Sequence, residues 1–414
     1  MFSLLGSEFV KPVFLYRSYT GYTLVELLSN TVTEYQVKKT HLIESYAGLP
    51  SPLAGKEAWN YVEVRDGAHM FWWLYYADNP SASDLPLVMW LQGGPGGSGS
   101  GFGNFEEIGP LNRNLEPRKT SWSVPFYIFS ESYGGKMAAA ISSELIKAIE
   151  QGTVKCKFAG VALGDSWISP LDSVMTWGPY LYTTSLLDDY GLADVNNAAE
   201  EVKKAVEQQE FLKATELWSM TESVVEQNTN GVNFYNILTQ EPDEKLTSSA
   251  GENFIALQTR RHIRPLHSQS LSELMNGPIR KKLGIIPQNV TWGGQAEDVF
   301  SYMAGDFMRP VVDIVDQLLA AGVNVTVYNG QLDLIVDTMG QELWVKQLKW
   351  EGLPGFNKLR WTALDDPISP GITGAFYKTY KNFAFYWILR AGHMIPSDQG
   401  AMALQMMKMI TQQV

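Results

Sequence analysis

Residues 124–140 read VPFYIFSESYGGKMAAA, and this stretch decides the fold. The apolar and aromatic run before Ser130 is typical of a buried strand. From Lys136 to Glu150, apolar side chains recur on one face of a helix. Ser132 lies between the two, at the apex of a tight turn. This layout predicts a nucleophile elbow, in which the serine hydroxyl is exposed above a helix N-terminus. Ser130 stands where the motif expects a first glycine, so an ordinary strand-to-helix turn stays open.

The composition describes a folded, acidic protein. Of 414 residues, 45% are hydrophobic and 18% are charged, which is enough to bury a large core and excludes a disordered chain. The net charge of −12 argues against nucleic acid or an anionic membrane as a partner. Cys156 is the only cysteine, so no intrachain disulfide and no cysteine-based metal site can form. The five histidines show no metal-binding pattern, and the sequence predicts no metal and no cofactor.

The N-terminal part of the chain shows no targeting or membrane-spanning segment. No run of about 18 apolar residues occurs that would cross a bilayer. The first residues are mildly apolar, but they lack a basic start, and Glu8 and Lys11 interrupt them, unlike a secretory signal. Residues 1–55 have no clean periodicity and end in a segment rich in Pro, Gly and Ser. We expect an atypical N-terminal segment outside the core, followed by one main domain over residues 56–414.

Several runs before the serine predict further strands. Residues 59–64 and 69–77 flank a turn and predict a hairpin. Residues 85–92 predict a buried strand, and a glycine-rich stretch follows from Gly93 to Gly103. A flexible loop and an oxyanion loop both fit these glycines, whereas a phosphate loop does not, because no Gly-Lys-Ser/Thr follows. No helix is predicted between Trp90 and Phe126, although two parallel strands need a crossover.

Three residues with complementary chemistry follow the carboxyl ends of predicted strands. They are Ser132, Asp333 and His393, after strands ending near residues 129, 330 and 390. Binding and catalytic sites form at this edge of open α/β sheets. A histidine activates the weak serine nucleophile, and a buried carboxylate orients the histidine. The order Ser, Asp, His is that of α/β-hydrolases. Asp306 and Asp337 are rival acids. Residues 171–295, largely helical, are expected to form a cap insertion over a mostly parallel sheet.

Four blocks of the sequence resemble the serine carboxypeptidases, the peptidase S10 type. WLQGGPGGSG (90–99) is similar to the family's WLNGGPGCSS, and FSESYGGK (129–136) to GESYAGK. NGQLDLI (329–335) and GHMIPSDQ (392–399) resemble the blocks that carry the family's Asp and His. The blocks occur in the family's order within residues 56–414. The resemblance implies an α/β-hydrolase fold and the release of C-terminal residues from peptides or proteins through an acyl-enzyme.

The resemblance also implies a role for each matching residue. Ser132 would be the nucleophile, His393 the base and Asp333 its orienting acid. Backbone N–H groups of Gly94 and Tyr133 would form the oxyanion hole. The residues that would bind the substrate's C-terminal carboxylate are Gln92, Gly93, Glu107 and Glu131. A substrate carboxylate and two glutamates cannot all be ionised at close range, so one glutamate must hold a proton at a raised pKa. We therefore expect activity at acidic pH that falls towards neutral.

The chain departs from the family pattern before the elbow. Relatives carry a strand, a D-x-P-x-G-x-G-x-S loop and a helix there, whereas residues 121–124 run straight into the elbow strand. The absent strand–helix unit explains the missing crossover and would leave backbone groups of neighbouring strands unpaired. The family's partner for Cys156 would lie in the absent segment. With the unusual N-terminus, this indicates an alternative transcript product or gene-model variant of a true carboxypeptidase.

Two further sequence features concern processing. Asn289 and Asn324 each begin an Asn-Val-Thr sequon, the acceptor pattern for N-glycosylation. The resemblance implies a secreted or lysosomal protein, although no clear signal peptide is visible. The sequence predicts no oligomeric state.

Three functions are compatible with these observations. The leading one is a serine-type carboxypeptidase that is most active at acidic pH. The alternative is a non-catalytic binding or regulatory protein on the same fold, which keeps the triad residues but does not assemble them. A third is an esterase or acyltransferase, against which Glu107 and Glu131 argue.

Overall fold

The strands of the described residues form one 11-stranded sheet in the order β2-β3-β4-β1-β5-β6-β7-β8-β11-β10-β9. This computed structural model describes residues 12–17, 41–43, 57–65, 67–76, 87–118, 126–154, 156–240, 254–294 and 296–412. At the centre of the sheet, five neighbouring strands run parallel: β5 (Val88–Leu91), β6 (Tyr127–Glu131), β7 (Gly160–Gly164), β8 (Asn324–Gly330) and β11 (Phe383–Ile388). The mostly parallel sheet confirms the predicted fold class.

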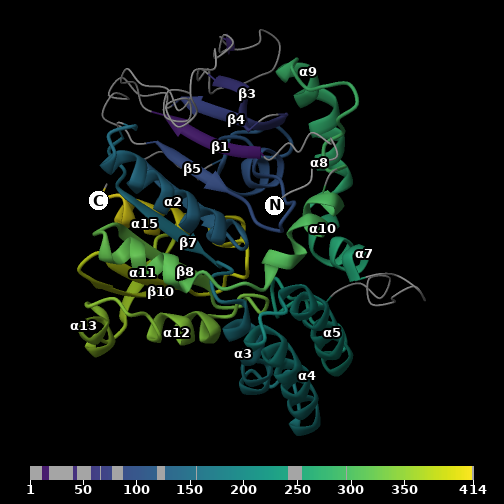
Figure 1. Cartoon of the computed structure of the whole chain (residues 1–414), viewed down its shortest axis with the longest axis vertical. Helices are drawn as coiled ribbons and strands as arrows, with labels where there is room; N and C mark the ends of the chain where they lie inside the picture. Colours follow the sequence, from purple (N-terminus) through teal and green to yellow (C-terminus); the bar gives the residue numbers. More distant parts are fainter. Residues whose placement is uncertain are drawn as a thin grey trace.

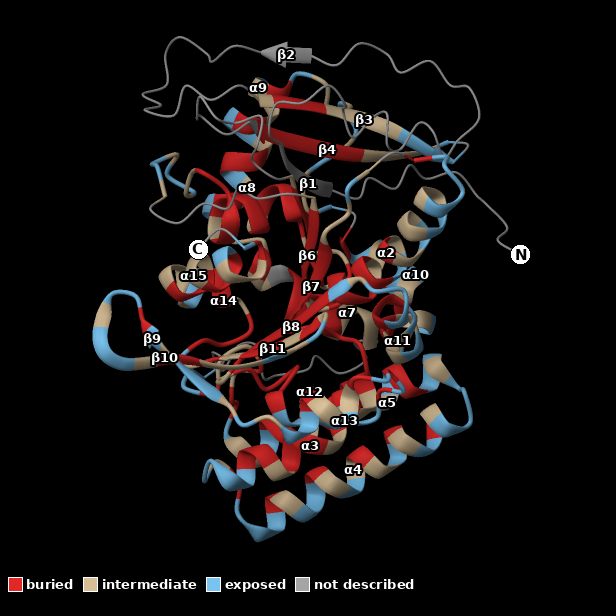
Figure 2. Ribbon diagram, turned by 90° about the vertical axis from the view of Figure 1, so that its left-hand side faces the viewer, coloured by how far each residue is buried: buried red, intermediate tan, exposed pale blue. Residues whose placement is uncertain are grey.

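Helices cover both faces of the parallel strands (Figures 1 and 2). One face packs against α2 (Gly134–Glu150), α11 (Val312–Ala320), α12 (Thr338–Lys346) and α13 (Leu353–Lys358). The other face packs against η2 (Gly99–Ile108), α14 (Ile395–Asp398) and α15 (Gly400–Ile410). Within β6, Ile128 belongs to the first core, while Tyr127 and Phe129 belong to the second. The alternation follows from the twofold side-chain period of a strand and explains why β6 is apolar at every core position.

The connection between β5 and β6 contains a helix that the sequence did not predict. Gly99–Ile108 forms a π-helix, with the hydroxyl of Ser98 accepting the Gly101 N–H at 3.0 Å. Glycines disfavour helices, but here packing requires them. A Cβ on Gly101 would lie 2.5 Å from the Trp292 ring, and one on Gly103 would lie 2.6 Å from Nε1 of Trp90. The expectation of no helix between Trp90 and Phe126 was therefore wrong, because tertiary contacts outweigh propensity.

The N-terminal edge of the sheet is antiparallel. β3 (Glu57–Arg65) and β4 (Ala68–Tyr76) form the predicted hairpin, and β2 (His41–Ile43) pairs with β3. β1 (Pro12–Arg17) lies between β4 and β5, parallel to the former and antiparallel to the latter. Residues 1–55 were expected to lie outside the core, yet β1 and β2 belong to its sheet. β1 provides backbone hydrogen-bond partners for both β4 and β5. The rest of residues 1–55 lies outside the described residues.

Helices α3 (Pro170–Thr183), α4 (Asp189–Glu207) and α5 (Phe211–Thr229) form a separate layer at the lower end of Figure 1. Helices α4 and α5 are separated where Gln209 has a positive φ of 60°. Asp306 lies in the last turn of α10 (Ala296–Phe307). The remaining elements are α7 (Phe254–Gln258), η3 (Thr259–Ile263), η4 (Arg264–Leu266), α8 (Gln269–Leu274), η5 (Met275–Ile279), α9 (Arg280–Leu283), β9 (Thr362–Asp366) and β10 (Ser369–Tyr380). Among the described residues, no helix combines the length and the apolar character needed to cross a bilayer.

Candidate active site

Ser132 lies in a strained turn between β6 and α2. Its φ is +59°, in the left-handed region that a serine rarely adopts. Its backbone N–H donates to Gly164 O at 3.1 Å, and its carbonyl accepts from Gly135 N and Trp167 N at 2.9 Å each. A Cβ on Gly134 would lie 2.1 Å from Leu91 O, so only glycine fits there. The turn therefore holds Ser132 at the carboxyl end of β6, as the elbow motif predicts.

Ser130, the residue that departs from the elbow motif, is fully buried within β6. Its hydroxyl donates to Ala162 O on the neighbouring strand at 3.2 Å. A serine at this position is compatible with the turn, because its side chain is satisfied inside the sheet.

Asp333 and His393 are brought together from two neighbouring strand ends, β8 and β11. The Nδ1 atom of His393 lies 2.7 Å from Oδ2 of Asp333, and both side chains are buried. Oδ1 of Asp333 accepts the Val336 N–H at 3.1 Å, which fixes the carboxylate. Burial lowers the pKa of His393 to about 4. A histidine oriented in this way is a neutral base above that pH.

The two rival acids have other partners. Asp306 forms an ion pair with Lys136 at 2.8 Å and accepts the Tyr133 hydroxyl at 2.8 Å. Asp337 is the N-cap of α12, where it accepts the Gly340 N–H at 3.0 Å and the Thr176 hydroxyl at 2.8 Å. These contacts give both aspartates structural roles away from His393.

The glycine-rich loop after β5 packs directly against the serine turn. A Cβ on Gly93 would lie 2.5 Å from Cβ of Ser132 and 2.8 Å from Tyr133 N. Gly94 follows with a φ of +117°, a conformation that favours glycine. The loop backbone therefore approaches the nucleophile closely, on the side where the Tyr133 N–H lies. Backbone donors in this arrangement can stabilise an oxyanion.

The predicted carboxylate-binding residues converge beside the serine. Nε2 of Gln92 donates to Oε1 of Glu131 at 2.6 Å, and Oε1 of Gln92 accepts from Trp90 Nε1 at 2.8 Å. Glu107, from η2, is completely buried, and neither of its carboxylate oxygens has a hydrogen-bond partner among the described residues. Oε2 of Glu131 is unpartnered as well. Unsatisfied buried oxygens of this kind indicate a position for a further polar group.

Both glutamates have raised pKa values. Burial raises the pKa of Glu107, and burial together with the negative charge of Glu107 raises the pKa of Glu131 well above its ordinary value. Arg118 lies behind Glu107, with Nη2 donating to the Glu107 carbonyl. Its positive charge favours the ionised form of Glu107. The proton of the pair therefore belongs on Glu131.

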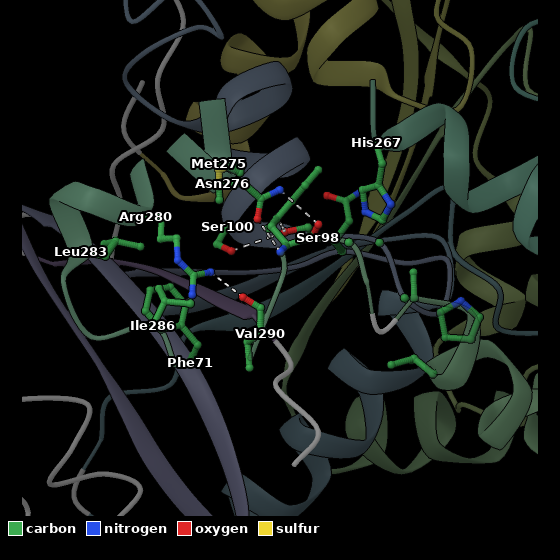
Figure 3. Close-up of a pocket in the computed structure, with 18 of the residues that line it drawn as sticks. Phe71, Ser98, Ser100, His267, Met275, Asn276, Arg280, Leu283, Ile286 and Val290 are labelled. Atoms are coloured by element: carbon green, nitrogen blue, oxygen red, sulfur yellow. Dashed lines mark hydrogen bonds between the residues drawn. The ribbon is translucent and has the colours of Figure 1, made fainter. Parts of the chain in front are cut away.

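A cavity of about 120 Å³ opens beside Gln92 and Tyr133 (Figure 3). The Arg280 side chain in its wall donates to the carbonyls of Val290 and Pro287, so its polar groups are occupied. Burial lowers the pKa of His267 to about 4, which leaves that ring neutral at pH 5 and above. The apolar part of the wall includes Phe71, Met275, Leu283, Ile286, Val290 and Trp292. The cavity thus suits an apolar group.

Sequence reasoning missed several residues around the triad. Asp165 directly follows β7 and is 1% exposed, and a carboxylate at the end of a predicted strand was a usable signal for it. Tyr235 lies against His393, with ring centroids 5.2 Å apart, and its hydroxyl lies 2.9 Å from Nδ1 of His262. Nε2 of His262 in turn lies 2.8 Å from Glu222. No sequence pattern linked these residues, because they come from segments that only the fold brings together.

The fold and the site define an α/β-type serine hydrolase, and the chain belongs to the serine carboxypeptidase family. The model of that family matches residues 47–124 and 120–413. The chain is similar to retinoid-inducible serine carboxypeptidase of Homo sapiens, with 57% identity over 417 positions that cover 87% of this chain and 92% of the relative. Serine carboxypeptidase-like 51 of Arabidopsis thaliana is 40% identical, with 86% and 92% covered. A crystal structure of Kex1(delta)p, a prohormone-processing carboxypeptidase from Saccharomyces cerevisiae, superposes with a TM-score of 0.72 at 16% identity, covering 88% of this chain and 93% of that one.

The relatives are also longer than this chain over the matched region. The two segments of the family match meet at residues 120–124, directly before β6. The alignment with the mouse retinoid-inducible enzyme spans 416 positions, more than the 414 residues of this chain, although it covers only 87% of it. The relative must therefore contain residues that have no counterpart here.

Proposed function

We propose that the chain removes C-terminal residues from peptides through an acyl-enzyme on Ser132. The observation that carries this proposal is the buried pair Glu107 and Glu131 beside the nucleophile, in which both oxygens of Glu107 and Oε2 of Glu131 have no hydrogen-bond partner among the described residues. An esterase or acyltransferase has no use for such a pair, whereas an enzyme that recognises a free carboxylate does.

In the proposed reaction, Oγ of Ser132 attacks the carbonyl carbon of the last peptide bond while His393 takes the serine proton. Asp333 keeps the imidazole oriented and stabilises its charged form. Backbone N–H groups of Gly94 and Tyr133 stabilise the negatively charged oxygen of the tetrahedral intermediate. His393 then donates the proton to the leaving amine, which departs as the free C-terminal residue. Water attacks the ester by the same route and regenerates Ser132.

The substrate's C-terminal carboxylate is bound by Gln92, the Gly93 N–H and the two glutamates. Protonated Glu131 can donate a hydrogen bond to a carboxylate, whereas ionised Glu131 repels it. Binding is therefore favoured at acidic pH and weakens as Glu131 loses its proton. The raised pKa of Glu131 supports this role.

The cavity beside Gln92 accommodates the side chain of the substrate's C-terminal residue. It borders the carboxylate-binding residues and is lined mainly by apolar side chains. We expect peptides that end in Leu, Met or Phe to be cleaved at least about tenfold faster than those that end in Lys or Asp. Residues 171–295 would act as the cap, since Met275, Arg280 and Trp292 in the cavity wall belong to that insertion.

The two sequons are compatible with passage through the secretory pathway, to a lysosome or outside the cell. Asn289 and Asn324 are both exposed, as a glycan requires. A mobility shift on deglycosylation of protein from secretory cells, lost when both residues are changed to Gln, would support N-glycosylation. An unshifted wild-type band would count against it.

The activity is tested with two matched peptides, one with a free C-terminus and one amidated. We expect release of the last residue from the free peptide at pH 5 and little release from the amidated one. A fluorophosphonate probe that labels wild type but not Ser132→Ala shows whether the triad is assembled. No labelling of folded wild-type protein would favour the non-catalytic alternative. Equal cleavage of both peptides would favour a different acyl-transfer enzyme.

A further inference from the structure

A third buried acid lies beside the proposed triad and has no role in the reaction described above. Asp165 directly follows β7, which lies in the sheet between β6, the strand before Ser132, and β8, the strand before Asp333. Its backbone is held with a φ of +40°, and its N–H donates to Tyr328 O at 2.8 Å. A residue other than glycine in this conformation, at the catalytic edge of the sheet, indicates that the fold holds it there at a cost.

The Asp165 side chain points at the triad. Oδ1 accepts the Gly330 N–H at 2.8 Å, while Oδ2 has no donor among the described residues. Asp165, Asp333 and His393 each contribute one polar atom to a cluster in which all of these atoms lie within 4.8 Å of one another. Two carboxyl groups are therefore buried side by side, and a neutral His393 gives them no positive charge.

Two adjacent buried carboxyls do not both ionise, so one of them holds a proton. Asp333 accepts from the Val336 N–H and interacts with Nδ1 of His393, and both contacts favour its ionised form. Asp165 has only the Gly330 N–H. The other ionisable groups nearby, Glu131 and Tyr328, are acids as well and add no positive charge.

We propose that Asp165 is a positioning residue that stays protonated and donates a hydrogen bond to Asp333, so that Asp333 carries the charge that orients His393. The unpartnered Oδ2 atom of Asp165 is where this proton lies. Burial raises the pKa of Asp165 well above its ordinary value, in agreement with this assignment. The proposal concerns the arrangement of the triad and rests on the proposed function only for its kinetic readout.

The same three side chains could instead hold a metal ion, since their ligand atoms are close together. The 2.7 Å contact between His393 and Asp333 argues for the proton, because a cation bound by both would have to replace that hydrogen bond. Unchanged activity after treatment with a chelator is expected. Activity that is lost on chelation and restored by a divalent ion would overturn the proposal.

Two substitutions of Asp165 distinguish a role as a hydrogen-bond donor from a role as a negative charge. In Asp165→Asn the amide still donates to Asp333 and still accepts from Gly330, so we expect kcat within about threefold of wild type. In Asp165→Leu the donor is lost, and we expect kcat to fall about tenfold or more with little change in KM. Asp337→Asn, which removes another buried carboxyl from the same edge, is the matched control. Because the pKa of Asp337 is raised to about 7, its side chain is uncharged at pH 5, and this substitution should leave kcat at that pH unchanged. Loss of activity in Asp165→Asn as large as in Asp165→Leu, or full activity in both, would overturn the proposal.

Infrared spectroscopy detects directly whether the Asp165 carboxyl group is protonated. The difference spectrum of wild type minus Asp165→Asn at pH 5 should contain the carbonyl band of a protonated carboxylic acid. Carboxylate bands in its place would overturn the proposal, and this measurement is decisive even if Asp165→Leu does not fold. The labelling rate of Ser132 by a fluorophosphonate serves as a second kinetic readout. If the wild type labels but cleaves no peptide, the proposed function fails while the Asp165 proposal is still tested.

Discussion

Two pairs of buried carboxyl groups flank Ser132, and they differ in what their oxygens contact. In the pair Glu107 and Glu131, neither oxygen of Glu107 has a hydrogen-bond partner in the part of the chain that the structure describes. In the pair Asp165 and Asp333, both oxygens of Asp333 are engaged, one by Val336 and one by His393. Burial raises the pKa of all four groups. Burial therefore acts on both pairs in the same way. We call Glu107 and Glu131 the open pair, because their oxygens are available to a substrate, and Asp165 and Asp333 the closed pair, because Asp333 contacts the catalytic base.

Two pairs that each hold a proton can therefore have different roles. Asp333 receives its hydrogen bonds from within the protein, so its pair is complete before a substrate arrives. Glu131 accepts one hydrogen bond, from Gln92, and its other oxygen and those of Glu107 are available to a ligand. We therefore expect changes to the Asp333 pair to alter the rate of the chemical step, and changes to the Glu131 pair to alter substrate binding and its pH dependence.

The largest expected effect is in the closed pair. Asp333→Asn keeps the shape of the side chain but removes the charge that fixes the tautomer of His393. We expect kcat to fall by about 10³–10⁴ with KM nearly unchanged. Steady-state kinetics on a peptide with a free C-terminus measures this, with circular dichroism as the check on folding. A tenfold rise in KM at unchanged kcat would contradict this assignment, because it would mean that Asp333 acts on substrate binding and not on the chemical step.

A smaller and different effect is expected in the open pair. Glu131→Gln keeps a hydrogen-bond donor but loses the acidic proton, and Glu107→Gln removes the charge that holds this proton in place. We expect kcat/KM to fall about 10–100-fold, mainly through KM, because one hydrogen bond to a charged group is weakened. An ester substrate without a free carboxylate is the control and should be affected much less. Equal losses on both substrates would assign Glu131 to the chemistry.

The pH profile of the wild type should reflect the titration of both His393 and Glu131. Activity should rise above about pH 4, where His393 becomes neutral and can act as a base. It should then fall towards neutral pH as Glu131 loses its proton, since its raised pKa places that loss above the ordinary range of a glutamate. In Glu131→Gln the fall should disappear while the rise stays. A wild-type profile that is flat from about pH 5 to pH 8 would contradict the role of the glutamate pair.

The triad could be predicted from the sequence because each member follows an apolar strand. Ser132, Asp333 and His393 all come after runs that stand out by hydrophobicity, and parallel strands bring their carboxyl ends together. Asp165 carried the same signal, because it directly follows the apolar run that forms β7. The contact of Arg118 with the Glu107 carbonyl and the walls of the cavity had no such signal, since they depend on how separate segments pack in the fold.

The N-terminal part of the sheet could not be predicted in the same way. Residues 12–17 read PVFLYR, a short apolar run in an aperiodic segment, and nothing local indicates pairing with β4 and β5. In the folded chain they fill the place between β4 and β5. The helix η2 was missed because its glycines disfavour a helix locally. In the fold these glycines are needed, since a side chain on them would clash with Trp90 or Trp292.

The smallest expected effect concerns stability, to which both pairs and Asp337 contribute. Their pKa values are raised in the folded protein, that of Asp337 to about 7, so the folded state binds more protons than the unfolded chain. Such groups stabilise the fold at acidic pH, and the stabilisation is lost as pH rises through the raised pKa values. Buried neutral His393 and His267, with pKa values of about 4, act in the opposite direction below about pH 6.

We therefore expect the melting temperature to be highest near pH 5–6 and to fall by several degrees towards pH 8. Asp337→Asn isolates one contribution, because the amide still accepts the Gly340 N–H but does not titrate. Its melting temperature should fall less between the two pH values than that of the wild type. A wild-type melting temperature that rises steadily to pH 8 would mean that the carboxyls are ionised in the folded state. The open and closed pairs would then have to be held by cations and not by shared protons.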